Sequence, residues 1–325
     1  MHVSYVDWGV VGGLACDALF RATMRLIALC LLAATAAACA SSPSVPMPPA
    51  PSRTAALEAA VHAQMARHPD ALIAVSVRDR ATGVRLDVNG DSVVHAASTM
   101  KLPILVELYR RVALGEMHLT DSLPVVNRFA SLVDGSPYVI EDDSDDGLYG
   151  RIGQKATLED LGERMTVVSS NLGANLLLQH LGAANVQATL ERLGGTHGMQ
   201  VRRGVEDGKA YRAGLNNVAT SRDLAELLDR VAYGEAVSPA ADAQIRAVLL
   251  RQRFNAMIPA GLPPGTPVAH KTGWITRHSH DAAIVMPEGQ PPYVLVILTK
   301  GFATNEAGDA AGAELARIVH AGLRP

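Results

Sequence analysis

Apolar runs with the alternation of β-strands lie at both ends of the long C-terminal part of this chain, and helical patterns fill the stretch between them. The predicted strands are residues 71–79, 84–90, 267–273, 280–287 and 292–299. Strands so far apart in sequence can share a core only if the two ends come together in one sheet. We therefore predict an α+β fold: an antiparallel sheet built from both ends and flanked by helices, with an inserted all-helical lobe.

Helical spacing of apolar residues gives the remaining elements. Residues 101–115 are apolar on nearly every side early on, which predicts a helix buried between the two lobes. The irregular stretch 120–155 contains the acidic run EDDSDD, which lacks the pattern of a calcium loop and is predicted to be a solvated loop. The predicted helices are 53–68, 101–115, a pair within 157–182, 221–234, 238–252 and 311–323.

The N-terminal segment has the pattern of a secretion signal. From Met24 a single arginine precedes a short apolar stretch, and small residues then lead to Cys39. This resembles a bacterial lipoprotein processing site with Cys39 as the lipidated residue, although a buried N-terminal helix with a chance cysteine is the alternative. We predict that residues 1–39 are an extension and signal peptide and that translation starts at Met24.

A linker follows the signal. Residues 40–53 are rich in proline and serine and have no periodicity. At about 3 Å per residue such an extended tether reaches about 40 Å from a membrane surface. The prediction is thus a periplasmic protein, lipid-anchored to the bacterial envelope, whose folded domain spans residues 54–325.

Composition excludes several classes of protein. The formal net charge of −3 gives no basic surface for a nucleic acid. All three cysteines lie in the first 39 residues, so the folded domain has no disulfide, cysteine nucleophile or thiolate metal site. The eleven histidines are scattered. We expect a monomer without a metal or other cofactor.

One serine–lysine pair stands out because the chain has only five lysines. Ser98 and Lys101 are three residues apart, at the start of the apolar run 101–115. On a helix this spacing brings the amine within reach of the hydroxyl, and a lysine with a lowered pKa can activate a serine. The alternative is an ordinary helix cap by Ser98 or Thr99. This stretch alone favours the cap.

Two later motifs favour catalysis. Ser169 and Asn171 lie at the break between two predicted helices, and Lys271, Thr272 and Gly273 end a predicted strand. Together these groups can supply a relay hydroxyl, an amide arm and an anion subsite around a nucleophile.

With these three motifs in this order, the chain resembles the penicillin-recognising serine hydrolases, most closely the class A β-lactamases. The resemblance covers roughly residues 55–322, with matching neighbourhoods around each motif. It implies a β-lactamase/transpeptidase-like fold, with Ser98 acylated by a β-lactam or a peptidoglycan-like acyl donor. Lys101 would then take part in proton removal, and Ser169 would pass a proton to the leaving nitrogen.

The same resemblance implies the substrate contacts. Asn171 would bind the substrate amide, and Lys271 and Thr272, followed by Gly273, would hold its carboxylate. The backbone N–H groups of Ser98 and Trp274 would form the oxyanion hole, which typically contributes about 3–4 kcal/mol to the barrier. Arg277 is a further candidate partner of the carboxylate.

The chain departs from the family pattern at two points. Ser170 stands where the second motif usually has aspartate, which puts the geometry of that turn in question. The residue four before Asn216 is Arg212, where class A enzymes have the glutamate that activates the deacylating water. Glu206, ahead of the helix near Thr220, is the candidate base, with Asp207 a weaker one; an exposed loop carboxylate is the alternative.

Three functions are compatible with these departures. With a working base, the protein is a serine β-lactamase that hydrolyses β-lactam antibiotics through an acyl-enzyme on Ser98. Without one, it is a slowly deacylating penicillin-binding protein, D-Ala-D-Ala peptidase or esterase of the same fold. A lipoprotein that binds a lactam or peptidoglycan without turnover is the third.

Overall fold

A computed structural model describes residues 52–195 and 198–324. The predicted signal peptide, Cys39 and nearly all of the tether lie outside these residues. Helix α2 (Arg53–Met65) begins at the last residue of the predicted tether, and the Ser52 hydroxyl caps it by accepting a hydrogen bond from the N–H of Ala55 at 3.2 Å. None of the helices within the described ranges is long and apolar enough to cross a membrane.

The predicted α+β architecture is confirmed. Five antiparallel strands form one sheet in the order β2-β1-β11-β10-β9, so the two ends of the domain meet where β1 pairs with β11. The β1–β2 hairpin turns at Gly83, whose φ of 72° suits a glycine. The strands are β1 (Leu72–Asp79), β2 (Val84–Val88), β9 (Val268–Ile275), β10 (His278–Val285) and β11 (Tyr293–Lys300).

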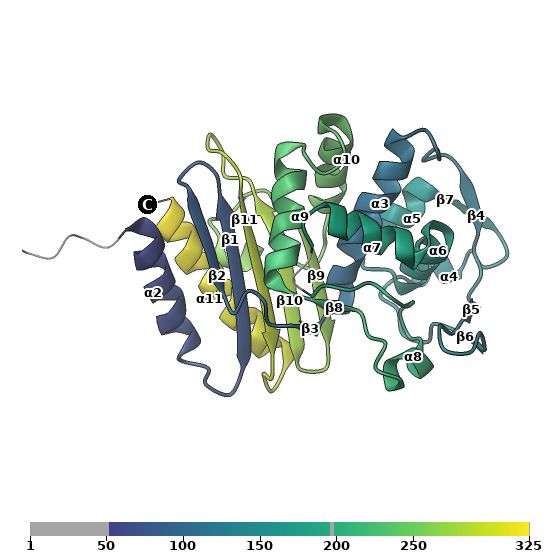
Figure 1. Cartoon of the computed structure of the whole chain (residues 1–325), viewed down its shortest axis with the longest axis horizontal. Coiled ribbons are helices and arrows are strands. Elements are labelled where there is room, and N and C mark those ends of the chain that lie inside the picture. The colour runs from purple at the N-terminus through teal and green to yellow at the C-terminus, as the bar shows by residue number, and fades with distance from the viewer. Residues whose placement is uncertain (1–51, 196–197, 325) are drawn as a thin grey trace, which may run out of the picture. The chain divides into compact units, whose positions relative to one another are not determined.

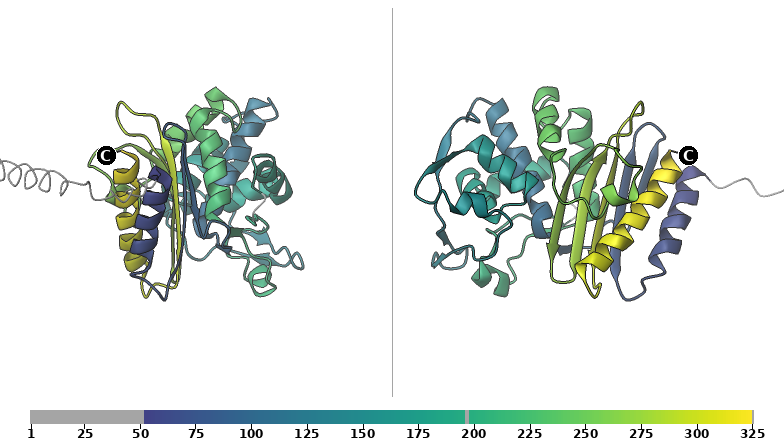
Figure 2. Two further views of the ribbon diagram at one scale, coloured as in Figure 1. Left: turned by 60° about the vertical axis from the view of Figure 1, so that its left-hand side comes forward. Right: turned by 180° about the vertical axis from the view of Figure 1, so that it is seen from behind.

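Each face of the sheet is covered by helices (Figures 1 and 2). Helices α2 and α11 (Asn305–Leu323) pack together on one face, and α9 (Ser221–Tyr233) crosses the other. The alternation of β1 explains this, because Val75 and Val77 belong to the core under α2 and α11, whereas Ala74 belongs to the core on the opposite side.

Helix α3 (Lys101–Ala113) is the centre of the helical lobe. Its first nine residues are buried, as the apolar pattern predicts, and it contacts α5, α6, α7 and α10. The helices of this lobe are α4 (Asp146–Tyr149), α5 (Leu158–Val167), α6 (Asn171–Leu181), α7 (Ala183–Arg192), α8 (Gly208–Arg212) and α10 (Pro239–Leu249). Helices α4, α7 and α8 were not among the predicted elements.

Several short elements complete the chain. Three of them lie around the start of α3: β3 (Val94–His95) pairs with β8 (Val218–Ala219), and the 3-10 helix η2 (Ala97–Met100) runs directly into α3. The others are β4 (Ser122–Pro124), β5 (Phe129–Ala130), β6 (Pro137–Tyr138), β7 (Lys155–Thr157) and the 3-10 helix η3 (Pro259–Gly261).

The prediction that the acidic run is a solvated loop is wrong for two of its residues. Asp145 is buried and forms an ion pair with Arg164 at 2.9 Å. The Asp143 carboxylate accepts hydrogen bonds from backbone N–H groups at the start of α6. Composition alone predicted that these carboxylates are solvated. The first N–H groups of a helix have no partner within the helix, and they and the arginine form strong hydrogen bonds with a carboxylate.

Candidate active site

Ser98 lies in the short 3-10 helix that leads into α3, and it is not a helix cap. Neither η2 nor α3 has a side-chain cap, so the cap interpretation is wrong. Instead, the Ser98 Oγ is 3.0 Å from the Nζ of Lys101. Ala97, just before it, has a φ of 46°, an uncommon backbone conformation of the kind that recurs at functional sites.

Lys101 is fully buried, and its amine is held by the α5–α6 turn and the first residue of α6. Its Nζ donates to the backbone carbonyl of Ser169 at 2.6 Å and to the Asn171 Oδ1 at 2.8 Å, and it lies 3.3 Å from the Ser169 Oγ. Burial lowers the pKa of Lys101 to about 7, and the nearby Asp143 carboxylate opposes this shift. The lowered pKa makes the neutral amine, which can accept a proton, accessible near neutral pH.

Ser169 joins the two scarce lysines. Its Oγ is 3.3 Å from the Nζ of Lys101 and 3.0 Å from the Nζ of Lys271. The residue is buried and has a φ of 61°, so the turn between α5 and α6 holds it in the left-handed region. A hydroxyl between two amines can pass a proton in either direction.

The third motif lies on β9, at the edge of the main sheet. Burial, together with the charge of Lys101, lowers the pKa of Lys271 well below its usual range. An incoming carboxylate would favour the charged form of Lys271. The buried Thr272 hydroxyl finds no hydrogen-bond partner among the described residues, so it is available to the same ligand group.

Gly273 allows β9 to approach the nucleophile. A Cβ at this position would lie 2.8 Å from the backbone N of Ser98 and 2.9 Å from that of Thr99, closer than packing permits. Trp274 follows it, 41% exposed, with its ring 4.7 Å from that of Phe254. The backbone of β9 at Gly273 thus lies close to the N–H of Ser98.

Asn171 is the first residue of α6, and both the Oδ1 and the Nδ2 of its side chain form hydrogen bonds. The Oδ1 accepts from Lys101, and the Nδ2 donates to the carbonyl of Asp142 at 2.9 Å. The second Nδ2–H can donate a hydrogen bond to the carbonyl of a substrate amide. The structure therefore brings Ser98, Lys101, Ser169, Asn171 and Lys271 together.

Glu206 is partly buried and bound to a neighbouring loop. Its carboxylate accepts from the N–H of Glu141 at 2.7 Å and from that of Asp142 at 3.2 Å. Its φ of 62° is another left-handed value. Two of the carboxylate's roughly four lone-pair positions are thus used, which leaves acceptor capacity for a water molecule.

Two other predicted groups have hydrogen-bond partners of their own. Asp207 is buried and accepts from Ser131, from the N–H of Leu132 and from the N–H of Ala210, which makes it a structural group of the α8 turn. Arg277 lies in the exposed turn between β9 and β10 and donates to the carbonyl of Gly301 at 2.7 Å.

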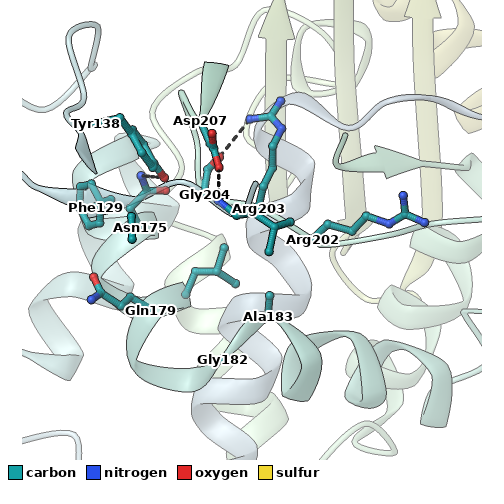
Figure 3. A pocket seen from close by; sticks show the side chains of 13 residues that line it. Phe129, Tyr138, Asn175, Gln179, Gly182, Ala183, Arg202, Arg203, Gly204 and Asp207 are labelled. Atoms are coloured by element: carbon teal, nitrogen blue, oxygen red, sulfur yellow. Dashed lines mark hydrogen bonds between the residues drawn. The ribbon is translucent and has the colours of Figure 1, made fainter. Parts of the chain in front are cut away.

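A pocket of about 260 Å³ lies beside the segment that carries Glu206, and neither Ser98 nor Lys101 lines it (Figure 3). At one side of it, the Asn175 side chain meets the Tyr138 hydroxyl. Asn175 also binds both the N–H and the carbonyl of Val205, the residue before Glu206. Asn175 and Asp143 were not predicted as site residues; for Asn175 the only signal was its place one turn after Asn171.

Comparisons with known proteins find relatives of the whole folded domain. A profile described as the beta-lactamase enzyme family matches residues 56–323. A beta-lactamase of Rhodobacter capsulatus is 25% identical over 257 residues, which is 78% of this chain and 84% of that protein.

Solved structures of penicillin-binding and β-lactamase proteins are similar to this chain in fold and sequence. PBP-A is similar with a TM-score of 0.73 and 26% identity, over 82% of this chain and 96% of that one. An ancestral class A beta-lactamase is similar with a TM-score of 0.70 and 26% identity, over 81% and 98% of the two chains. A mutant of PBP-A has been solved as an acyl-enzyme complex with penicillin G.

Proposed function

Because the chain belongs to the beta-lactamase enzyme family, we propose that it hydrolyses β-lactams through an acyl-enzyme formed on Ser98. The observation that carries this proposal is the 3.0 Å contact between the Ser98 Oγ and the Nζ of a buried lysine. A serine needs an adjacent base to act as a nucleophile, and a lysine whose pKa is about 7 is such a base at neutral pH.

The acylation step uses the groups around that contact. Neutral Lys101 takes the proton of Ser98 while the Oγ attacks the lactam carbonyl carbon, and the oxyanion is bound by backbone N–H groups. The C–N bond then breaks, and the Ser169 hydroxyl gives its proton to the leaving nitrogen. Ser169 recovers a proton from Lys101, whose Nζ lies 3.3 Å from its Oγ. The substrate carboxylate is held by Lys271 and Thr272.

Deacylation needs a water molecule and a base, and we propose Glu206 for that base. Its carboxylate binds the loop residue Asp142, whose carbonyl in turn binds Asn171 beside Lys101. Glu206 accepts hydrogen bonds from the N–H groups of Glu141 and Asp142, and these two contacts also favour a second candidate. In that candidate Glu206 only supports the loop, and the acyl-enzyme ester on Ser98 persists. That candidate is a slowly deacylating penicillin-binding protein, as the similarity to PBP-A suggests.

The Glu206→Gln variant separates the two candidates. With Glu206 as the base, we expect the variant to acylate at the wild-type rate and to deacylate about 10²–10⁴-fold more slowly, because a general base typically contributes that much. The measurement is the lifetime of the penicillin adduct, followed by mass spectrometry of quenched samples.

Glu141→Gln is the matched control, since this exposed carboxylate belongs to the same loop and only its backbone N–H meets Glu206. A wild-type adduct that persists, with no change in Glu206→Gln, favours the penicillin-binding protein. If the wild-type protein forms no adduct, the remaining candidate function is binding without turnover.

We further propose that the mature protein is anchored by a lipid on Cys39 to the periplasmic side of the bacterial envelope. The signal-like segment that ends in small residues before Cys39 supports this proposal. We expect Cys39→Ala to move the protein from the membrane fraction to the soluble periplasmic fraction, because no lipid can be attached. Cys30→Ala, within the apolar stretch, is the control and should stay with the membrane; a Cys39→Ala protein that also stays there contradicts the anchor.

A further inference from the structure

We propose that Asp143 is a positioning residue for acylation: its carboxylate fixes the start of α6, and with it Asn171, beside Lys101. This inference rests on the proposed function of the Ser98 site. It concerns a residue of the acidic run that neither the three motifs nor their spacing indicates.

The shortest hydrogen bonds of Asp143 come from the two N–H groups that open α6, and longer ones come from the N–H of Asp145 at 3.3 Å and the Ser170 hydroxyl at 3.5 Å. Its Oδ1 accepts from the N–H of Asn171 at 2.9 Å, and its Oδ2 accepts from the N–H of Leu172 at 2.8 Å. The Tyr149 hydroxyl lies 3.3 Å from the same Oδ2. A carboxylate bound to two N–H groups of a helix start is held in one orientation, and it satisfies donors that have no partner within the helix.

The neighbours of Asp143 bind the same turn. The carbonyl of Asp142 accepts from the Asn171 side chain at 2.9 Å, and the Ser144 hydroxyl donates to the carbonyl of Val168 at 2.5 Å. Residues 142–144 therefore contact both sides of the turn that carries Ser169. Asn171 is fixed through its backbone and its side chain at once.

This arrangement explains the serine in the second motif. Ser170 stands where the resemblance leads one to expect an aspartate, and its hydroxyl caps α6 by accepting from the N–H of Gly173 at 3.1 Å. That contact satisfies one helix-end donor but brings no negative charge. Asp143 supplies the charge from a different loop, 28 residues earlier in the chain than Asn171.

Asp143 also acts on the base. Its negative charge holds the pKa of Lys101 above the value that burial alone would give. The other groups that meet the Lys101 amine are the polar Ser98, Ser169 and Asn171, and the second amine, Lys271, is joined to it through Ser169. Loss of the Asp143 charge should therefore lower the pKa of Lys101, while loss of its contacts should loosen Asn171.

The first test measures the acylation rate by penicillin against pH in Asp143→Ala and Asp143→Asn. We expect Asp143→Ala to acylate about 10–100-fold more slowly, as misplacement of a reacting group by about 1 Å typically does. In both variants the acid limb of the pH profile should move to lower pH, because Lys101 stays neutral to lower pH. Asp146→Asn is the control, since it removes an exposed charge from the same acidic run, and it should leave both quantities unchanged.

A second variant separates the loss of positioning from a loss of stability. Ser170→Asp in the Asp143→Ala background returns a carboxylate to the start of α6, and we expect it to recover at least part of the rate and the wild-type position of the acid limb. Wild-type rates and an unmoved acid limb in Asp143→Ala would overturn the inference. The inference would also be overturned if Ser170→Asp restored the melting temperature of the Asp143→Ala protein to the wild-type value but left its slow acylation unchanged.

The third measurement does not depend on turnover. With only five lysines, the side-chain NMR signals of the protein can be resolved, and Lys101→Met identifies the signal of Lys101. We expect its pKa to be lower in Asp143→Asn than in the wild type. An unchanged pKa contradicts the inference even if the protein is an active β-lactamase. If the wild type forms no adduct, the proposed function fails, but this pKa still decides the role of Asp143.

Discussion

Replacement of Ser98 by alanine is expected to abolish the covalent adduct with penicillin and to lower kcat/KM for β-lactam hydrolysis by about 10⁴-fold or more, as loss of a nucleophile does in serine hydrolases. The physical reason is that the Ser98 hydroxyl is the one that meets the amine of a buried lysine in the first motif. Intact-mass spectrometry after incubation with penicillin gives the adduct, and a chromogenic lactam gives kcat/KM.

The variant should remain folded, because alanine fits the 3-10 helix and Ser98 is not a cap. Ser92→Ala, in the loop before β3, is the matched control and should keep both the adduct and the rate. If the Ser98→Ala protein still gains the mass of penicillin, the nucleophile is another residue and the proposed mechanism fails as a whole. If it loses the adduct and keeps hydrolysis, the reaction is not covalent.

The main sheet could be predicted because its signal is local. Residues such as Val75 and Val77 alternate with residues of the other face, and this period of two is set by the strand backbone itself. The pairing of β1 with β11 followed from the need to bury both strands together. Helix α7 was missed because only two large apolar residues, Val186 and Leu190, mark its buried face.

The three motifs were predictable from residue type and order, but the contacts that join them were not. The meeting of Lys101 and Lys271 at the Ser169 hydroxyl depends on the packing of α3, the α5–α6 turn and β9. The left-handed backbone of Ser169 leaves no mark in sequence, since serine is not a residue type that signals such a φ.

The role of the acidic run was predicted wrongly for a related reason. Charge and composition indicate solvation, whereas the partner of Asp143 is the backbone of α6, and backbone N–H groups have no sequence identity. The departure at Ser170 was the only sign in the sequence that the start of α6 needs a carboxylate from elsewhere.

The largest effect on pH dependence is expected at Lys101. In the wild type, the rate of acylation should be half-maximal near pH 7 and fall about tenfold per pH unit below it, because burial lowers the pKa of Lys101 to about 7 and only the neutral amine accepts the proton of Ser98. The sign follows from the charge: as pH falls through that value, the amine becomes an ammonium and the base is lost. Stopped-flow acylation between about pH 5 and pH 9 measures this limb.

Two substitutions separate the base from the charge. Lys101→Ala should lower the acylation rate by about 10³–10⁴-fold and remove the limb near pH 7, because no titrating amine then touches Ser98. Lys101→Arg should be equally slow, since a guanidinium remains protonated throughout this range even though it keeps the positive charge. Lys155→Ala, an exposed lysine on β7, is the control and should keep the wild-type profile. An active Lys101→Arg enzyme, or a wild-type rate that stays flat through pH 7, would mean that Lys101 holds the site by its charge and that another group takes the proton of Ser98.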